Sequence, residues 1–548
     1  MRIALATLNS KFIHSNLSLW CIKAGIDAFC AEKHEVKVFE STVNADTDKF
    51  CEDIISFKPD VVAFSCYIWN IEKTLPLCKK IKESTDCIIA LGGPEVEYRA
   101  RDILIDKSFV DYIISGEGEW SFSSFVNGLE IKNFEEAEGV SFIDNGKLIC
   151  FAAKAHKDTP PSPYTEEYFK KLGGRIAYIE SSRGCPFRCA YCLSGQLSGL
   201  RYFDESSVFD NIVKLSHSGT KTIKFIDRTF NADAEKANRI LNFIKENYGK
   251  SISESVCFHF EIAADILKDS TIEILSDMPK GLCQLEIGIQ SFNKKTLVAI
   301  NRKSDLTKLC ENIKKLVSFR NMHIHTDLIA GLPFEDINSF KNSFNKAFEL
   351  KADMLQLGFL KMLYGAEMRR NEDSFPCEYK KTPPYEIISN EWLAECDIKT
   401  LKYCEEALER LYNSGRFLIT LRYLFDDRGF DPFETFCEFG ESSEFSGMSL
   451  SEFTEKVWLF FKDRCDENKL RECILSDINS LPVNIHIPDG LVKYDPMYKR
   501  LKKKYSELLQ KNVRIVLLHS ENKVMVIHTD KTDKITGRYV FELFDYEE

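Results

Sequence analysis

No apolar stretch in the 548-residue sequence approaches the roughly 18 residues that a membrane-spanning helix needs. Residues 1–6 enter an apolar strand pattern directly, so we expect no signal peptide there. A surplus of basic charge is also lacking. The net charge of −11 excludes a surface built for non-specific nucleic-acid binding. The 19 cysteines are odd in number and scattered, which favours free thiols in a reducing cytoplasm over a disulfide framework.

Three of these cysteines form a compact motif. Cys185, Cys189 and Cys192 stand at C-x3-C-x2-C spacing, directly after the apolar run 176–179, which predicts a strand followed by a loop. Three thiolates on one loop can converge on a soft metal centre. A four-iron cluster held by three cysteines keeps one iron without a protein ligand, and that iron is a reaction site. Structural zinc is the alternative, but no second cysteine pair lies nearby to complete four ligands.

Residues 1–135 alternate strand and helix patterns. The expected strands are short and almost wholly apolar, which predicts an α/β, doubly wound parallel sheet: residues 3–8, 35–39, 61–65, 87–91 and 112–115. No G-x-G-x-x-G follows the first strand, which argues against a dinucleotide site. Such sheets bind ligands at the carboxyl ends of their strands. The candidate binding residues there are Asn9, Ser65, Tyr67, Gly92, Gly93, Gly116, Glu117 and Gly118.

Residues 136–175 read as a linker with a hairpin at 139–150, and residues 176–368 repeat strand and helix as a full or partial β/α barrel. The expected barrel strands are 176–179, 222–227, 256–262, 284–289, 323–329 and 354–359. Catalytic groups in such barrels belong at the carboxyl ends of the strands. The polar residues near those ends are Asp227, Asn231, Glu261, Glu286, Gln290, Ser291 and Asp327. For any single one, a strand-end cap is the common structural alternative.

Residues 370–548 are expected to form an α+β domain without an assignable chemical motif. Helical patterns cover 386–413 and 449–475, and three alternating segments at 513–519, 524–530 and 538–544 predict a terminal meander. A basic run at 499–504 lies on an expected helix. A solvated face is the first interpretation of this run, and contact with an anionic substrate or RNA is the second.

The segment 181–192 resembles the signature of the radical S-adenosylmethionine (SAM) superfamily, with an aromatic residue, Tyr191, before the third cysteine. The resemblance implies that Cys185, Cys189 and Cys192 hold a [4Fe-4S] cluster whose open iron binds SAM. Reduction would then cleave SAM to a 5′-deoxyadenosyl radical, and Tyr191 would lie against the adenine.

Three further segments resemble elements of that superfamily. Residues 225–230 are similar to its second-strand F-x-D-x-x-F segment. Residues 286–292 are similar to the E-x-G-x-Q-S element near the SAM methionine and ribose. Residues 327–333 are similar to the fifth-strand turn beside SAM. The SAM-binding residues that the resemblance implies are Tyr191, Glu261, Glu286, Gln290, Ser291 and Asp327.

The first domain resembles the cobalamin (B12)-binding domain that precedes many radical SAM cores, on its loops 92–95 and 116–119. The eight loop residues of this domain would then contact cobalamin. None of the ten histidines stands in D-x-H-x-x-G, and only His14 lies near a strand end of this domain. Cobalamin would therefore bind without a histidine lower ligand. A domain that keeps the fold and binds nothing is the alternative. Residues 370–548 resemble domain of unknown function 4080.

These resemblances imply an enzyme: a cobalamin-dependent radical SAM methyltransferase acting on an unactivated carbon, whose catalytic residues stay unassigned. Two alternatives stay open. One is a cobalamin-independent lyase, cyclase or mutase with a vestigial B12 domain, and the other is a cobalamin- and cluster-binding sensor. The family implies an oxygen-sensitive, anaerobic reaction fed by a flavodoxin- or ferredoxin-type electron donor. The substrate is open among small molecules, peptides and RNA.

Overall fold

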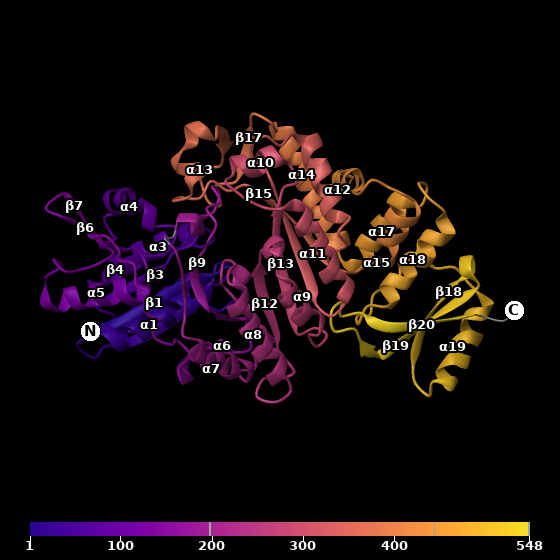
Figure 1. Cartoon of the computed structure of the whole chain (residues 1–548), viewed down its shortest axis with the longest axis horizontal. Coiled ribbons are helices and arrows are strands. Elements are labelled where there is room, and N and C mark those ends of the chain that lie inside the picture. Colours follow the sequence, from indigo (N-terminus) through magenta and orange to yellow (C-terminus); the bar gives the residue numbers. More distant parts are fainter. Residues whose placement is uncertain (197–198, 443, 546–548) are drawn as a thin grey trace. The chain divides into compact units, whose positions relative to one another are not determined.

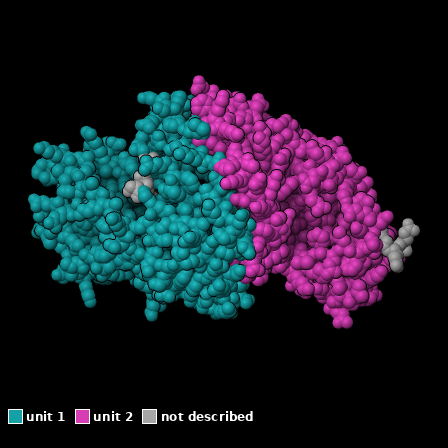
Figure 2. Space-filling model, viewed as in Figure 1, with its two compact units in different colours: residues 1–275, 298–304, 360–390 teal, residues 276–297, 305–359, 391–548 magenta. Residues whose placement is uncertain are grey.

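The computed structural model describes residues 1–196, 199–442 and 444–545, and it divides into two compact units (Figure 2). Unit 1 contains residues 1–275, 298–304 and 360–390. Unit 2 contains residues 276–297, 305–359 and 391–548. Across the described ranges, no helix has the length and hydropathy that crossing a bilayer would require.

Unit 1 begins with a sheet in the order β2-β1-β3-β4-β5-β6-β7 (Figure 1). The strands β1 to β5 run parallel, and every residue of β3 is buried, as expected for a strand covered on both faces. The doubly wound fold is confirmed. The hairpin expected at 139–150 forms and extends this sheet through antiparallel pairing with β5. The strands are β1 (Arg2–Asn9), β2 (Glu35–Thr42), β3 (Val61–Ser65), β4 (Ile88–Gly92), β5 (Tyr112–Ile114), β6 (Val140–Asp144) and β7 (Lys147–Cys150).

Five helices accompany this sheet. Helix α1 packs against α5, and α2 packs against α3. The order 2-1-3-4-5 changes direction between β1 and β3, and ligands bind in such sheets at the carboxyl edge beside this switch point. The helices are α1 (Leu17–Phe29), α2 (Thr47–Ser56), α3 (Ile71–Ser84), α4 (Ala100–Asp106) and α5 (Gly118–Ile131).

The remainder of unit 1 holds three parallel strands in the order β8-β11-β12 and two small antiparallel ribbons, β9–β10 and β16–β17. The expectation that 386–413 is helical throughout is wrong at its start. Residues 387–390 form β17, because this β-branched Ile-Ile segment pairs with β16. The strands are β8 (Ala177–Ile179), β9 (Ser182–Gly184), β10 (Leu200–Tyr202), β11 (Thr222–Phe225), β12 (Cys257–Ile262), β16 (Cys377–Tyr379) and β17 (Ile387–Asn390). The helices are α6 (Glu166–Leu172), α7 (Glu205–Ser216), α8 (Ala234–Asn247), α9 (Asp269–Ser276) and α13 (Glu367–Arg370).

Unit 2 contains the parallel strands β13 (Cys283–Gln290), β14 (His323–Ala330) and β15 (Met354–Phe359). Buried and half-buried residues alternate along β13 and β14, so every second side chain of these strands lies on a half-buried face. Glu286 and Gln290 of β13 and Asp327 of β14 all belong to this face. The accompanying helices are α10 (Lys294–Ala299), α11 (Leu306–Phe319) and α12 (Ile337–Phe348).

The C-terminal part of unit 2 is helical and ends in the expected meander, β18-β19-β20, which is antiparallel (Figure 1). The segment expected to be helical at 449–475 forms two helices, because Asp466 caps the start of a new one. The basic run lies on α19, as expected. The elements are α14 (Glu395–Leu408), α15 (Leu418–Arg422), α16 (Pro432–Glu441), α17 (Leu450–Phe461), α18 (Glu467–Asn479), α19 (Pro496–Leu508), β18 (Val513–Leu518), β19 (Lys523–Thr532) and β20 (Tyr539–Asp545).

Candidate active site

The loop that carries Cys185, Cys189 and Cys192, called the cysteine loop below, begins directly after β9. The ribbon β9–β10 fixes this beginning, which is the base of the loop. Gly184, next to Cys185, pairs with Leu200, so the chain returns beside the point where the loop begins. Gly184 has φ of 97°, and a Cβ atom there would lie 2.0 Å from the carbonyl oxygen of Gly199. Only glycine fits this position. Cys189 is buried and the other two cysteines are half-buried. The base of the loop is thus fixed by backbone geometry.

Asp227 anchors the start of the cysteine loop. Its fully buried carboxylate accepts hydrogen bonds from the Ser181 amide at 2.9 Å and from the hydroxyls of Ser181 and Ser182 at 2.6 Å each. Burial raises the pKa of Asp227 to about 6, and these hydrogen bonds only partly oppose the shift. The Cys185 sulfur lies 3.5 Å from the Thr229 hydroxyl in the same segment. Asp227, the carboxylate of the F-x-D-x-x-F segment, therefore supports the cysteine loop by holding the residues that precede it.

A segment at 298–304, which the sequence did not indicate, covers the other side of the cysteine loop. The amide of Ala190 donates to the Ile300 carbonyl at 2.9 Å, and the Asn301 side chain donates to the Arg188 carbonyl at 2.9 Å. The Arg302 guanidinium lies 3.8 Å from the Cys189 sulfur. Burial raises the pKa of the Cys189 thiol, and Arg302 opposes that shift by favouring the thiolate. A cation at this position stabilises thiolate ligands.

Tyr191 lies beside the same cation. Burial raises the pKa of its phenol, and Arg302 opposes the shift. In unit 1, Glu261 forms an ion pair with Lys224 at 3.3 Å, so part of its charge is already balanced within the protein. Both residues were expected beside SAM. The structure places Tyr191 within the cysteine loop and Glu261 at the end of β12.

The E-x-G-x-Q-S element occupies the end of β13. Gln290 has φ of 72°, which is uncommon for a residue other than glycine, and the register of β13 with β14 shifts at this point. Its Oε1 atom is buried and lacks a hydrogen-bond partner in the described structure. An unpaired buried acceptor in strained backbone is a feature of ligand sites. Ser291 differs, because its hydroxyl donates to the Glu335 carboxylate at 2.7 Å within the protein.

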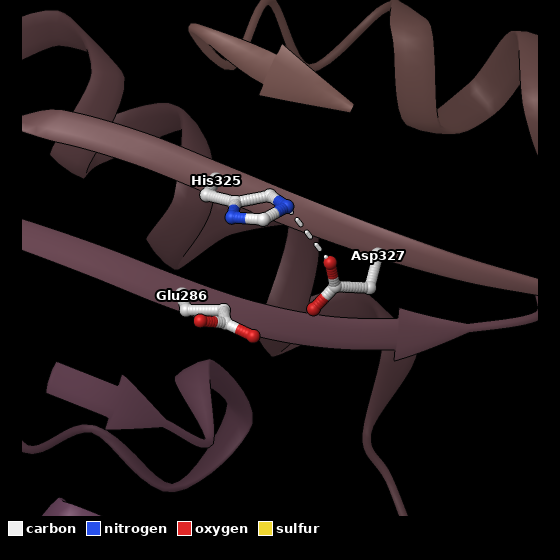
Figure 3. Close-up of side chains that lie close together, drawn as sticks. All are labelled: Glu286, His325 and Asp327. Atoms are coloured by element: carbon white, nitrogen blue, oxygen red, sulfur yellow. Dashed lines mark ion pairs between the residues drawn. The ribbon is translucent and has the colours of Figure 1, made fainter. Parts of the chain in front are cut away.

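Glu286, His325 and Asp327 form the only three-donor cluster of the described residues (Figure 3). Glu286 pairs with His325 across β13 and β14, and Asp327 follows two positions later on the same face. The His325 Nε2 atom lies 2.9 Å from Asp327 Oδ1. The two carboxylates were expected, and the histidine was missed because no motif marks it. Alternation along the predicted strand would have placed His325 on the same face as Asp327.

A cavity of about 720 Å³ lies at the carboxyl edge of the first sheet, within unit 1. All eight residues expected at a cobalamin site line it: Asn9, Ser65, Tyr67, Gly92, Gly93, Gly116, Glu117 and Gly118. Tyr67 and Trp69 stack with ring centroids 4.3 Å apart at its wall, and Gly93 has φ of 105° with no room for a Cβ beside the Cys66 carbonyl. The cavity is thus large and is bordered by a stacked aromatic pair and by glycine backbone.

Residues of the cysteine-loop region line the same cavity. They come from β8, from the turn between β8 and β9, from β9 and from the segment after β11: Tyr178, Glu180, Arg183, Ile226 and Arg228. His14 also lines it, and its Nδ1 atom lies 2.6 Å from the Tyr178 hydroxyl. Burial, helped by Lys11 and Lys224, lowers the pKa of His14, so its imidazole is neutral at pH 7. A ligand in this cavity therefore lies between the sheet edge and the base of the cysteine loop.

Family models match three successive segments of the chain. Residues 3–126 match the B12 binding domain, residues 179–347 the radical SAM superfamily, and residues 373–547 DUF4080, a protein family of unknown function. The chain is a radical SAM protein with a B12-binding domain. All three resemblances inferred from the sequence are thereby confirmed.

Curated relatives match about half of the chain. A 2-(S-pantetheinyl)-carbapenam-3-carboxylate methyltransferase of Streptantibioticus cattleyicolor is 26% identical over 328 residues, which cover 53% of this chain and 45% of the relative. The cobalamin-dependent radical SAM methyltransferase TokK of Streptomyces tokunonensis is 26% identical, with the same coverage. An anaerobic magnesium-protoporphyrin IX monomethyl ester cyclase of Cereibacter sphaeroides is 24% identical, covering 56% of this chain and 52% of the relative. The chain spans about half the length of these relatives.

Two solved structures share the fold. OxsB, a cobalamin-dependent S-adenosylmethionine radical enzyme with aqua-cobalamin bound, gives a TM-score of 0.60 at 14% identity, covering 92% of this radical SAM protein and 84% of OxsB. TsrM of Kitasatospora setae, a radical S-adenosylmethionine methyltransferase with cobalamin and a [4Fe-4S] cluster bound, gives 0.57 at 14% identity, covering 67% and 73%. At these identities the likeness concerns the fold.

Proposed function

We propose that this protein is a cobalamin-dependent radical SAM enzyme that methylates an unactivated carbon of its substrate. One observation carries the proposal. A single cavity of about 720 Å³ is bordered on one side by the eight glycine-rich and polar loop residues of the B12-binding domain and on the other by residues next to the cysteine loop. A flat cofactor held there would face the cluster site, which is the arrangement that methyl transfer to a substrate radical needs.

Cys185, Cys189 and Cys192 would hold the [4Fe-4S] cluster. Their spacing, their place on one glycine-based loop and the Arg302 guanidinium near Cys189 support this assignment. The positive charge of Arg302 lowers the free-energy cost of placing thiolates and a negatively charged cluster in a half-buried site. Asp227 and the Ile300 carbonyl hold the loop from two sides, so that the ligands are ordered before the cluster binds.

SAM carries a positive sulfonium and an ammonium group, which carboxylates stabilise. Within unit 2 we assign its binding to Glu286, Asp327 and the unpaired Oε1 atom of Gln290. Tyr191 and Glu261 stay predicted SAM-binding residues of unit 1. Ser291 was also expected to bind SAM, but its hydroxyl donates to Glu335 within the protein. We therefore propose that Ser291 stabilises the turn after β13.

Cobalamin would occupy the large cavity, with its corrin against the glycine loops and the stacked Tyr67 and Trp69 rings. When bound, the cluster and SAM supply a 5′-deoxyadenosyl radical, and cobalamin supplies a transferable methyl group. The chain's own residues orient these groups and exclude water from the space between them. A flavodoxin- or ferredoxin-type protein would supply the electrons.

Labelled SAM tests this proposal without knowledge of the substrate. Anaerobically reconstituted protein with hydroxocobalamin, a reductant and methyl-labelled SAM should form 5′-deoxyadenosine and also place label on cobalamin. The Cys185→Ala, Cys189→Ala and Cys192→Ala variants should lose the visible absorbance of the cluster and form no 5′-deoxyadenosine. A full cluster in all three variants, or no cobalamin binding by the wild type, would contradict the assignment.

Radical chemistry without methyl transfer is the second candidate function. The relative from Cereibacter sphaeroides supports it, because that protein is named as a cyclase. The same experiment separates the two. Formation of 5′-deoxyadenosine with no label on cobalamin would support a cyclase, lyase or mutase.

A further inference from the structure

The ribbon at the base of the cysteine loop carries two arginines directly opposite each other. Arg183 of β9 pairs with Arg201 of β10 in the antiparallel ladder. Like charges in opposed positions destabilise a two-stranded ribbon. The two side chains are only 19% and 16% exposed, so solvent and salt screen this repulsion weakly. The ribbon therefore needs negative charge from another element.

That charge comes from the segment after β5, which carries Glu117 and Glu119, and from Glu180 just before β9. The Glu117 carboxylate accepts from Arg183 at 2.5 Å and from Arg201 at 2.7 Å. Glu119 accepts from Arg183 at 2.5 Å, and Glu180 accepts from it at 2.8 Å. Burial alone would raise the pKa of Glu117, but hydrogen bonds from the two arginines outweigh burial and hold this pKa below its usual value. Glu117 is ionised and shared between the two strands.

These two arginines and three glutamates form one charged network, which adjoins both the large cavity and the cysteine loop. Glu117, Glu119, Glu180 and Arg183 all line the cavity, and Arg183 stands two residues before Cys185. Glu117 was expected from the sequence to contact cobalamin. Glu117 lines the cavity as expected, and both of its carboxylate oxygens also accept hydrogen bonds from the ribbon.

We propose that Arg183, held by Glu117 and Glu119, is a positioning residue that couples occupation of the cobalamin cavity to the geometry of the cluster loop. The inference rests on the proposed function, because it takes cobalamin as the occupant of the cavity. A cofactor that presses on the loop at 116–119 moves the two carboxylates, and the rigid fork of the guanidinium transmits that movement to the ribbon. Arg183 acts through the ribbon and touches no reacting atom.

A second connection holds the cysteine loop in place independently of Arg183, and it makes Arg183 variants accessible to experiment. The amide of Met368 donates to the Ala190 carbonyl in the cysteine loop at 3.0 Å, and the neighbouring Arg369 lies 4.8 Å from the Tyr385 ring centroid. The Tyr385 hydroxyl donates to Glu95. Because this connection remains when Arg183 is replaced, we expect such variants to fold and to keep part of the loop geometry.

Coupling can be measured as a ratio of two dissociation constants. Hydroxocobalamin binding is titrated before and after anaerobic reconstitution of the cluster, and the ratio reports how strongly one site senses the other. We expect a ratio of at least about fivefold in the wild type, in the range typical of coupled sites. Arg183→Gln and Glu117→Gln should bring it close to one, and Arg183→Lys should give an intermediate value because it keeps the charge and loses the fork.

Arg538→Gln is the matched control. It breaks a buried ion pair with Asp477 at 2.8 Å in unit 2, so it should lower stability and leave the ratio unchanged. A second measurement is the electron paramagnetic resonance (EPR) spectrum of the reduced cluster, which should change on cobalamin addition in the wild type and not in Arg183→Gln.

Each outcome decides the matter. A ratio of one in the wild type, or a wild-type ratio in folded Arg183→Gln, overturns the coupling and leaves the proposed function intact. Failure of the wild type to bind hydroxocobalamin overturns both. If Arg183→Gln does not fold, the isosteric Glu117→Gln variant carries the same test from the opposite side of the network.

Discussion

At the scale of single residues, the candidate site combines two kinds of polar side chain. Some have a polar atom without a partner in the protein, which a ligand can bind, and others use their polar atoms in hydrogen bonds that hold the protein's own loops. Gln290 has a strained backbone and an unpaired buried acceptor, whereas the neighbouring Ser291 satisfies its hydroxyl on Glu335. Asp227 belongs to the second kind, since three hydrogen bonds from Ser181 and Ser182 saturate its carboxylate. The sequence motifs named all three residues and could not tell these roles apart, because the partners lie far away in the chain.

Gln290 and Ser291 can therefore be separated by SAM binding. Gln290→Ala should keep the cluster and weaken SAM binding by about 10- to 100-fold, since a hydrogen bond to a charged group contributes about 1.5–3 kcal/mol. Ser291→Ala should reduce stability and change SAM affinity little. Equilibrium binding of SAM to the two reconstituted variants checks this. Equal affinities in both variants would return Gln290 to a purely structural role.

Asp227 should make stability depend on pH in an unusual direction. Its folded pKa of about 6 is above the unfolded value, so its contribution to the free energy of unfolding is complete at low pH and is lost as pH rises through about 6. Lowering the pH from 7 to 5 should therefore stabilise the wild type relative to Asp227→Asn by about 1 kcal/mol.

Urea unfolding of both proteins at several pH values measures this difference. Asp204→Asn is a control of opposite sign. Hydrogen bonds from Ser206 and Ser207 lower the pKa of the exposed Asp204, so its contribution is lost as pH falls. A pH-independent difference between wild type and Asp227→Asn would show that Asp227 is ionised throughout.

At the scale of elements, the base of the cysteine loop depends on one glycine. Gly184→Ala would place a Cβ 2.0 Å from the Gly199 carbonyl oxygen, so the ribbon must separate and the loop lose its fixed base. We expect Gly184→Ala to bind less than half of the wild-type iron after reconstitution. Gly199→Ala is the control, since Gly199 also has a positive φ, of 80°, but open space where its Cβ would lie. Equal iron content in both variants would contradict this account.

Most elements could be predicted from the sequence because each carries its own pattern. The five strands of the first sheet and the barrel strands are short apolar runs, and the expected boundaries differ from the observed ones by few residues, as at 88–92 against the expected 87–91. The failures have non-local causes. Residues 387–390 form a strand only through pairing with β16, and His325 and Arg302 lie near expected site residues only after folding.

At the scale of the whole molecule, residues of one charged network line the large cavity and adjoin the cysteine loop. Eight loop residues from four strand ends converge on one cavity because parallel strands present their carboxyl ends at one edge. That convergence follows from the doubly wound pattern and was predictable. The ion pairs of Arg183 and Arg201 with Glu117 join residues 66 and 84 positions apart, and composition gives no indication of such pairings.

The residues that line the cavity also bear on the lower ligand of cobalt in bound cobalamin. His14 lines the cavity, but its Nδ1 atom lies 2.6 Å from the Tyr178 hydroxyl, and the sequence around it lacks D-x-H-x-x-G. If that nitrogen accepts the phenol proton, the other nitrogen carries hydrogen and cannot bind a metal. We therefore expect cobalamin to bind with its dimethylbenzimidazole displaced and no histidine in its place, with Asn9, Ser65 and Tyr67 facing the lower side of the corrin.

EPR of the cob(II)alamin form decides this, because a nitrogen ligand splits the cobalt lines. The wild type should show no nitrogen superhyperfine splitting, and His14→Ala should give the same spectrum. Splitting that disappears in His14→Ala would identify His14 as the ligand and refute the ligand-free site. Splitting that survives in His14→Ala would mean that the dimethylbenzimidazole stays bound. Tyr178→Phe removes the hydroxyl near Nδ1, so splitting that appears only in that variant would show that Tyr178 keeps the imidazole away from cobalt.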